Sequence, residues 1–242
     1  MKKFNVSFPY FLEYPIKVVV NRLGLLGLFG WVFQKFGKRW IRPNNIVVSE
    51  RIVELPNVYA FLGKYSRVGD SILEIGHVNS SLALELANLG YQVTAIDIRD
   101  YPFSHRNLRN LKSDFLTYDF GTARFSWIIS VSAIEHLGYN RRYGGDREGD
   151  QDLDQSAFEK ISKLLMPGGW FILTVPYAAQ GGKHWFKVYT RDTIEALLDR
   201  CFGIEAKKYY FRNDNQWFET ANPDQDPQSP TNGVAIFLLK KR

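Results

Sequence analysis

The spacing of apolar residues between positions 71 and 98 changes from that of a strand to that of a helix and back. An apolar run at 72–75 predicts a short buried strand. Four leucines give the next segment an apolar helical face, which Gly90 ends: Leu82, Leu84, Leu86 and Leu89. Apolar residues at 93–96 predict a second strand. We therefore expect a strand, a turn, a helix and a second strand, the repeating unit of a parallel sheet.

The same alternation continues to the end of the chain. Five further segments are predicted to be strands, at 110–114, 124–132, 169–176, 204–211 and 234–240. Helices are expected at 49–65, 155–165 and 190–198, and the polar segment 213–233 is expected to be a loop. Strands that alternate with helices are typical of α/β folds. We predict a Rossmann-like sheet of seven strands, mostly parallel, with helices on both of its faces.

Polar residues at the ends of the first two strands indicate a nucleotide site. Glu74 and Gly76 lie at the turn after the first strand, and Asp97 ends the second strand about twenty residues later. In open α/β sheets such a turn brings backbone N–H groups to a ligand, and the acid accepts hydrogen bonds from ribose hydroxyls. An ordinary strand-to-helix turn without a ligand is the alternative.

The composition of this turn separates two classes of adenosine cofactor. A dinucleotide site requires G-x-G-x-x-G, so that the pyrophosphate can approach bare backbone. Residues 76–80 contain one glycine, with Val78 and Ser80 at later positions of the turn, and Glu74 would repel a pyrophosphate. S-adenosylmethionine carries a sulfonium, an ammonium and no phosphate, so the turn favours this cofactor over NAD.

Three more motifs follow in the same order along the chain. Asp114 could bond the adenine amine, and Phe115 could pack on the adenine ring. The segment 130–136 follows the fourth strand, and Pro167-Gly168-Gly169 forms the turn that leads into the fifth. Ligands of open α/β sheets bind outside the carboxyl ends of the strands. The residues at those ends are therefore expected to line one site.

Together these motifs resemble the class I S-adenosylmethionine-dependent methyltransferases over residues 50–242. The wider sequence, with SVSAIEHLG and LLMPGGWFILTVPY, is similar to a branch of that family with a degenerate glycine turn, whose members often accompany cell-surface glycan synthesis. The resemblance implies an antiparallel C-terminal hairpin in the sheet and S-adenosyl-L-methionine as the cofactor. It implies cofactor-binding roles for Glu74, Gly76, His77, Asn79, Asp97, Ile98, Asp114, Phe115, Ser130 and Glu135.

Two histidines are candidate catalytic residues, because methyl transfer to a hydroxyl usually needs a base beside the acceptor oxygen. His136 follows the fourth strand, where it can reach a substrate cleft, and His184 lies in a glycine-bearing loop after the fifth. The alternatives are a loop-ordering role for His136 and a surface position for His184. A divalent metal is not favoured and no metal ligand is assigned, because Ser132 replaces the first acid of the E-x-x-E-H motif of related enzymes. The acidic insert at 140–154 could bind a cation or a sugar, or it could be a solvated loop.

Charge divides the chain into two parts. The 242-residue chain has a net charge of +6, yet residues 1–42 alone carry eight Lys and Arg against one acid, and the remainder is nearly neutral. We distinguish a basic, apolar extension at 1–48 from a methyltransferase-like domain at 49–242. The domain has no nucleic-acid signature, and the single cysteine, Cys201, fits a reducing cytoplasm.

The extension has three open interpretations. Its apolar run at 23–33 is too short to span a bilayer. Residues 16–40 could cover the domain, lie on the inner face of an anionic membrane, or form a homodimer contact.

The sequence therefore predicts a methyltransferase that acts on a hydroxyl of a sugar, a glycan precursor or a similar polar small molecule. One alternative is methylation of a lipid-linked intermediate, which the basic, apolar extension would favour. Another is a cofactor-binding scaffold without transfer activity, which Val78 and Ser80 suggest.

Overall fold

A computed structural model of the chain describes residues 48–139, 153–183, 186–213, 216–221 and 233–242. The expectations for residues 1–47, for the insert at 140–152 and for His184 lie outside the described residues, as does most of the segment 213–233. No helix in the described segments is long and apolar enough to cross a membrane.

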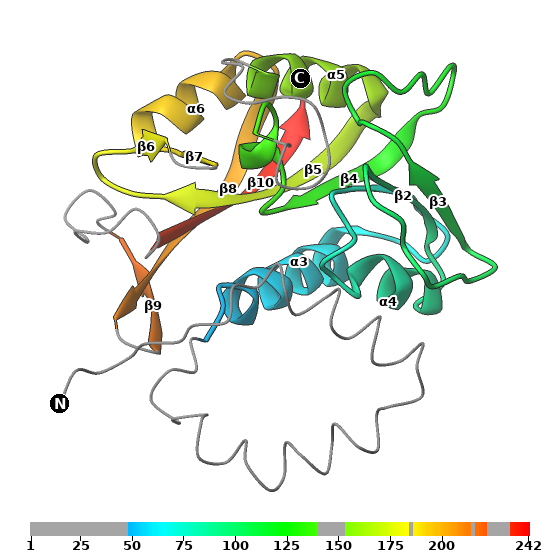
Figure 1. Cartoon of the computed structure of the whole chain (residues 1–242), viewed down its shortest axis with the longest axis horizontal. Helices are drawn as coiled ribbons and strands as arrows, with labels where there is room; N and C mark the ends of the chain where they lie inside the picture. Colours follow the sequence, from blue (N-terminus) through cyan, green and yellow to red (C-terminus); the bar gives the residue numbers. More distant parts are fainter. Residues whose placement is uncertain (1–47, 140–152, 184–185, 214–215, 222–232) are drawn as a thin grey trace, which may run out of the picture. The chain divides into compact units, whose positions relative to one another are not determined.

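One mixed sheet forms the centre of the domain (Figure 1). Its strands are β1 (Ser71–Ile75), β2 (Gln92–Asp97), β3 (Leu108–Lys112), β4 (Phe125–Val131), β5 (Leu165–Tyr177), β8 (Phe202–Asn213), β9 (Gln216–Thr220) and β10 (Gly233–Lys241). Their order across the sheet is β3-β2-β1-β4-β5-β10-β8-β9. The first five strands pair in parallel, and the last three are antiparallel to their neighbours. The predicted α/β fold and the antiparallel C-terminal strands are confirmed.

The number of strands differs from the prediction by one. Seven strands were expected, whereas the sheet has eight, because β9 forms inside the segment expected to be a loop. Its residues are mostly exposed and polar, so no apolar run marks it. The strand is held by antiparallel pairing with β8 and by the Phe218 ring, which stacks on Phe211 at 5.5 Å. A separate two-stranded sheet joins β6 (Gly182–Lys183) to β7 (Lys187–Val188).

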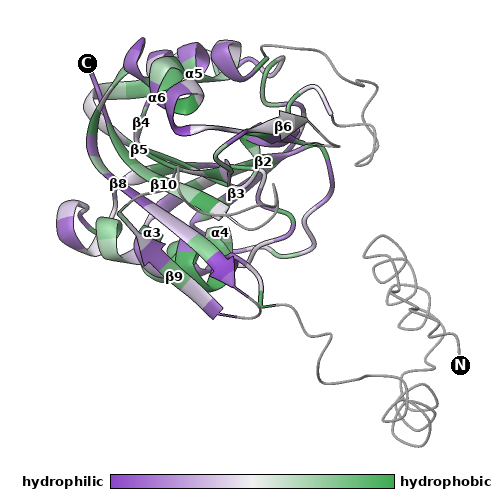
Figure 2. Ribbon diagram, turned by 90° about the vertical axis from the view of Figure 1, so that its left-hand side faces the viewer, coloured by the Kyte–Doolittle hydropathy of each residue, from purple (hydrophilic) through white to green (hydrophobic). Residues whose placement is uncertain are grey.

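Helices cover both faces of the main sheet, as Figures 1 and 2 show. On one face lie α3 (Arg51–Tyr65) and α4 (Leu82–Asn88), and on the other lie α5 (Leu153–Leu164) and α6 (Arg191–Asp199). Each helical pair buries apolar side chains against the strands, with Leu62 and Leu86 in one core and Phe158 and Leu198 in the other. The sheet is therefore apolar on both faces, which explains the continuous apolar runs in its central strands.

The strand order places a crevice between two neighbouring strands. From β1 the chain runs to β2 and β3 on one side, then returns to β4 and β5 on the other side. The connections that leave β1 and β4 therefore diverge at the carboxyl ends of these strands. This is the position where open α/β sheets bind ligands.

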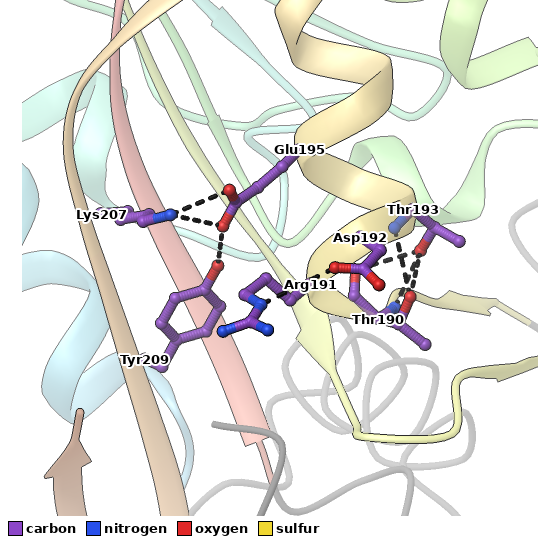
Figure 3. Close-up of polar contacts among 7 residues, drawn as sticks. All are labelled: Thr190, Arg191, Asp192, Thr193, Glu195, Lys207 and Tyr209. Carbon is purple, nitrogen blue, oxygen red and sulfur yellow. Dashed lines mark hydrogen bonds and ion pairs between the residues drawn. The ribbon is translucent and has the colours of Figure 1, made fainter. Parts of the chain in front are cut away.

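Helix α6 begins with a reciprocal pair of hydrogen bonds (Figure 3). The hydroxyl of Thr190 accepts a bond from the backbone N–H of Thr193 at 3.2 Å, and the hydroxyl of Thr193 accepts one from the N–H of Thr190 at 2.9 Å. One turn further on, the Glu195 carboxylate accepts bonds from Lys207 at 2.8 Å and from the Tyr209 hydroxyl at 2.7 Å. These contacts attach α6 to β8.

Replacement of Thr190 by alanine is expected to lower the free energy of unfolding by about 1 kcal/mol, because the first turn of α6 loses its cap. Thr122→Ala is the matched control, since Thr122 is exposed in a turn. Urea unfolding of both variants checks this expectation. Equal stability of the two variants would show that the cap contributes nothing.

Candidate cofactor pocket

A pocket opens at the carboxyl ends of β1, β2 and β4. It encloses about 700 Å³ of empty space, part of which is open solvent. Its walls come from five segments of the chain: Arg51 on α3; Ile75, Gly76 and Asn79 after β1; Ile96, Asp97, Ile98 and Arg99 at the end of β2; Ser113, Asp114 and Phe115 after β3; and Ser132, Ala133, His136 and Leu137 after β4.

Seven of the residues singled out in the sequence line this pocket together. Six are predicted cofactor contacts, and the seventh is the candidate catalytic residue His136: Gly76, Asn79, Asp97, Ile98, Asp114, Phe115 and His136. These positions span sixty residues of the sequence, and the parallel strands bring them to one edge of the sheet.

The other four predicted contacts lie behind the pocket wall. The side chains of Glu74, His77, Ser130 and Glu135 are almost completely buried, and none of the four is among the residues that line the pocket. His77 packs edge-on against the ring of Tyr101, with ring centroids 4.7 Å apart. Burial lowers the pKa of His77. Cofactor contact by these four side chains stays a prediction.

Gly76 brings the first turn against the segment that follows β4. Its backbone has a φ of +80°, and a Cβ atom at this position would lie 2.4 Å from the Cβ of Ala133. A side chain would therefore be both strained and obstructed. The later turn position Ser80 carries a side chain without conflict, since its hydroxyl accepts a bond from the N–H of Leu82, the first residue of α4. One glycine is enough for this turn.

Asp97 is held in place by four hydrogen bonds. One carboxylate oxygen, Oδ1, accepts from the backbone N–H of Arg99 and from its Nε, both at 3.0 Å. The other, Oδ2, accepts from the backbone N–H of Val78 at 3.2 Å and from Arg99 Nη2 at 3.0 Å. The carboxylate therefore links the turn after β1 to the end of β2.

Two residues of α3 belong to the site, although the sequence analysis did not single them out. Arg51 lines the pocket, and its guanidinium pairs with the buried Glu54 carboxylate at 2.5 Å. Glu54 also accepts hydrogen bonds from the hydroxyls of Ser132 at 2.6 Å and Thr174 at 2.5 Å. Ser132 has a φ of +45°, in the region that favours glycine. The network holds this strained residue at the pocket wall.

A signal for α3 was present in the sequence. Glu54 and Asn57 occupy the same buried stripe of the helix as Val58 and Leu62. Polar residues at apolar helical positions need partners inside the protein. Their spacing indicates a buried polar contact, but the tertiary fold determines its partners, which lie directly after β4 and on β5.

Burial, opposed by Arg51 and reinforced by the nearby acids Asp97 and Glu85, raises the pKa of the Glu74 carboxyl to about 8. Within the described part of the chain, Glu74 Oε2 has no hydrogen-bond partner. Its environment thus favours the protonated, uncharged form of Glu74. The expectation that its negative charge would repel a pyrophosphate is therefore weakened, because burial disfavours that charge.

This raised pKa predicts a pH-dependent stability. The folded protein binds a proton at Glu74 more tightly than the unfolded chain, so its stability is greatest below the unfolded pKa and falls as the pH rises towards 8. Glu74→Gln cannot ionise. From pH 5 to pH 9, its free energy of unfolding should rise by about 2 kcal/mol or more relative to wild type. Urea unfolding at both pH values measures this difference, and Glu205→Gln on the exposed face of β8 is the control. A constant difference between Glu74→Gln and wild type would contradict it.

The wall of the pocket after β4 includes the short 3₁₀ turn η3 (Ile134–His136). His136 is about one-fifth exposed, its Nε2 lies 3.9 Å from a carboxylate oxygen of Glu135, and its ring meets Phe186 edge-on at 5.8 Å. Burial raises the pKa of the Glu135 carboxyl. Behind this turn, buried Asp154 accepts bonds from Lys187 at 2.5 Å and from Tyr189 at 3.1 Å. His136 is thus the residue of this turn that is both ionisable and open to the pocket.

Across the segments that the structure describes, no group of three or more His, Cys, Asp or Glu side chains is arranged to hold a metal ion. Ser132, at the first position of the E-x-x-E-H pattern, donates to Glu54 instead.

No protein-family model matches the sequence, and no curated protein matches it. Solved structures with a similar fold include several methyltransferases. The N-methyltransferase NodS of Bradyrhizobium japonicum WM9, in complex with S-adenosyl-L-homocysteine, is 16% identical, with a TM-score of 0.57 over 87% of this chain and 98% of that chain. The Burkholderia thailandensis 1,6-didemethyltoxoflavin-N1-methyltransferase, with 1,6-didemethyltoxoflavin and S-adenosylhomocysteine bound, is 15% identical, with a TM-score of 0.58 over 98% of this chain and 93% of that chain. An S-adenosylmethionine-dependent methyltransferase from Mesorhizobium loti is 15% identical, with a TM-score of 0.54 over 78% and 97%. At these identities the likeness establishes the Rossmann-like methyltransferase fold.

Proposed function

We propose that this protein transfers a methyl group from S-adenosylmethionine to a hydroxyl of a sugar or a similar polar small molecule. One observation carries the proposal. The glycine turn after β1, the acid that ends β2 and the acid–aromatic pair after β3 line a single pocket at the carboxyl edge of the sheet. Two solved structures with this fold contain S-adenosylhomocysteine.

The residues of the pocket fit the parts of this cofactor. Gly76 lets the turn after β1 lie against Ala133, where a Cβ atom would clash, and so shapes this side of the pocket. Asp97 provides carboxylate oxygens for a ribose diol, and Phe115 provides an apolar wall for a purine ring. Arg51 places a positive charge in the same pocket, suited to a carboxylate group. When bound, the sulfonium supplies an already activated methyl group.

His136 is the proposed base for the acceptor hydroxyl, because a neutral imidazole near the acceptor can take up its proton. Replacement by glutamine should lower kcat about 100-fold, since general base catalysis is lost. Affinity for S-adenosylhomocysteine should change less than about threefold, because the imidazole acts on the acceptor. Steady-state kinetics and calorimetry measure the two effects. His105→Gln is the control, since His105 does not line the pocket. A loss of affinity without a loss of kcat would assign His136 to cofactor binding.

Transfer to nitrogen is the second candidate, favoured by the names of two similar structures, which are N-methyltransferases. The basic extension at 1–48 supports a third acceptor class, a lipid-linked sugar at the inner face of the membrane. Its segment 16–40 would provide the membrane contact, or a homodimer contact, and a cytoplasmic site of action is part of this proposal. A scaffold without transfer activity would bind the cofactor and methylate nothing.

An assay for S-adenosylhomocysteine release separates these candidates. The acceptors are a nucleotide sugar, an amino-sugar oligosaccharide and a polyprenyl-linked sugar, the last presented in vesicles with anionic lipid. Release with the nucleotide sugar supports the proposal. Release only with the amino sugar moves the acceptor atom to nitrogen, and release only with the vesicles supports the lipid-linked class. Cofactor binding without release for any acceptor would favour the scaffold.

A further inference from the structure

The Asp97 carboxylate has no hydrogen-bonding capacity left for a ribose in this structure. A carboxylate offers about four lone-pair positions. Four hydrogen bonds fill them: one from the Val78 amide, one from the Arg99 amide and two from the Arg99 guanidinium. The guanidinium also donates to the side-chain oxygen of Asn79 at 3.1 Å. Arg99 therefore makes hydrogen bonds to Asp97 and Asn79, two of the residues predicted to contact the cofactor.

The four donors differ in how easily they can be replaced. The two amides belong to the backbone, one in the turn after β1 and one directly after β2. This backbone is fixed by the parallel pairing of β1 with β2 and by the hydrogen bond from the Gly76 N–H to the Ile96 carbonyl at 2.8 Å. The guanidinium is at the end of a flexible side chain that is 28% exposed, whereas the Asp97 side chain is 4% exposed. The two guanidinium bonds are therefore easier to exchange for other donors than the two amide bonds are.

A ribose needs the positions that the guanidinium holds. Its two vicinal hydroxyls donate two hydrogen bonds, the same number that Arg99 Nε and Nη2 make. An ion pair between exposed side chains contributes little free energy. When one partner is buried, as Asp97 is, breaking the pair costs free energy unless new donors replace the lost ones. Hydroxyls can provide those donors, but without the positive charge. The affinity for the nucleoside is therefore lower than it would be if Arg99 did not bond to Asp97.

We propose that Arg99 sets the affinity of the pocket for adenosyl ligands by competing with the ribose hydroxyls for Asp97. The inference rests on the proposed function, because it requires that the pocket binds an adenosyl cofactor. Binding exchanges the two guanidinium bonds for two hydroxyl bonds and retains the two amide bonds. Arg99 is thus a positioning residue that holds Asp97 and Asn79 in place and is displaced by the ligand.

Calorimetric titration with S-adenosylhomocysteine tests the proposal. Arg99→Ala should bind about tenfold more tightly than wild type, since charge-assisted hydrogen bonds no longer have to be broken. Arg99→Lys should fall between the two, because an ammonium keeps the charge but lacks the planar two-point geometry. Arg109→Ala is the control, an exposed arginine on β3 that does not line the pocket. Its affinity should equal that of wild type. Thermal unfolding verifies that each variant is folded, and Arg99→Lys carries the test if the alanine variant is not.

The outcomes separate the inference from the proposed function. The proposal is supported if Arg99→Ala binds more tightly than wild type while the affinity of Arg109→Ala is unchanged. It is also supported if Arg99→Ala binds the ligand and wild type does not. Equal or weaker binding overturns it while wild type still binds, because Arg99 would then be a bystander or a ligand contact. An equal gain in Arg109→Ala also overturns it, since net charge would explain the effect. Absence of binding by wild type and all variants contradicts the proposed function and removes the basis of the inference.

Discussion

Replacement of Asp97 by alanine is expected to weaken the binding of S-adenosylmethionine and S-adenosylhomocysteine by about 100-fold or more. Two charge-assisted hydrogen bonds to the ribose would be lost, each contributing about 1.5–3 kcal/mol. The Val78 and Arg99 amides would also lose their common acceptor, so the turn after β1 would no longer be tied to the end of β2.

The control for this experiment is Asp100→Ala, which removes the same charge three residues away. Asp100 is exposed and pairs with Lys112 at the surface, so its loss should leave affinity within about twofold of wild type. Asp97→Asn separates charge from shape, because an amide oxygen still accepts hydrogen bonds from the backbone. Calorimetry measures all four proteins. Wild-type affinity in Asp97→Ala would remove Asp97 from the site.

The second large effect is expected at Gly76. Gly76→Ala should lower the free energy of unfolding by about 3 kcal/mol, because the new Cβ meets Ala133 and the backbone keeps a positive φ. The displaced turn should also weaken cofactor binding. Urea unfolding and calorimetry measure the two consequences.

Two further variants separate the steric cost from the conformational cost. Gly69 has a φ of +90° and nothing within 4 Å of its added Cβ, so Gly69→Ala reports the conformational cost alone, about 1 kcal/mol. Combining Gly76→Ala with Ala133→Gly removes the clashing methyl and should restore part of the loss. Equal losses in Gly69→Ala and Gly76→Ala would show that the approach to Ala133 is unimportant.

The sequence predicted the helices and strands that are determined by the residues within their own segment. Apolar runs identified the strands that are buried on both faces, and residues at their ends became neighbours because parallel strands end at one edge. Asp97, Asp114 and Gly76 could be found this way. Strand β9 could not, because its polar residues give no apolar pattern and its pairing with β8 supplies the stabilisation.

The sequence could not show which side chains are buried or which side chains pair with one another. The buried positions of Glu74 and Glu135 depend on how the turns after β1 and β4 pack, although both lie next to residues that do line the pocket. The contacts of Glu54 join three elements that are distant in sequence. The pairing of Arg99 with Asp97 depends on a side-chain conformation, for which the spacing of two residues gives no specific pattern.

The most direct test of the central claim is calorimetric titration of the wild-type protein with S-adenosylmethionine, with NAD as the comparison ligand. The account predicts saturable binding of one S-adenosylmethionine per chain and no binding of NAD, because the turn after β1 has one glycine and leaves no bare backbone for a pyrophosphate. Binding of NAD without binding of S-adenosylmethionine would contradict the account and would assign the pocket to a dinucleotide.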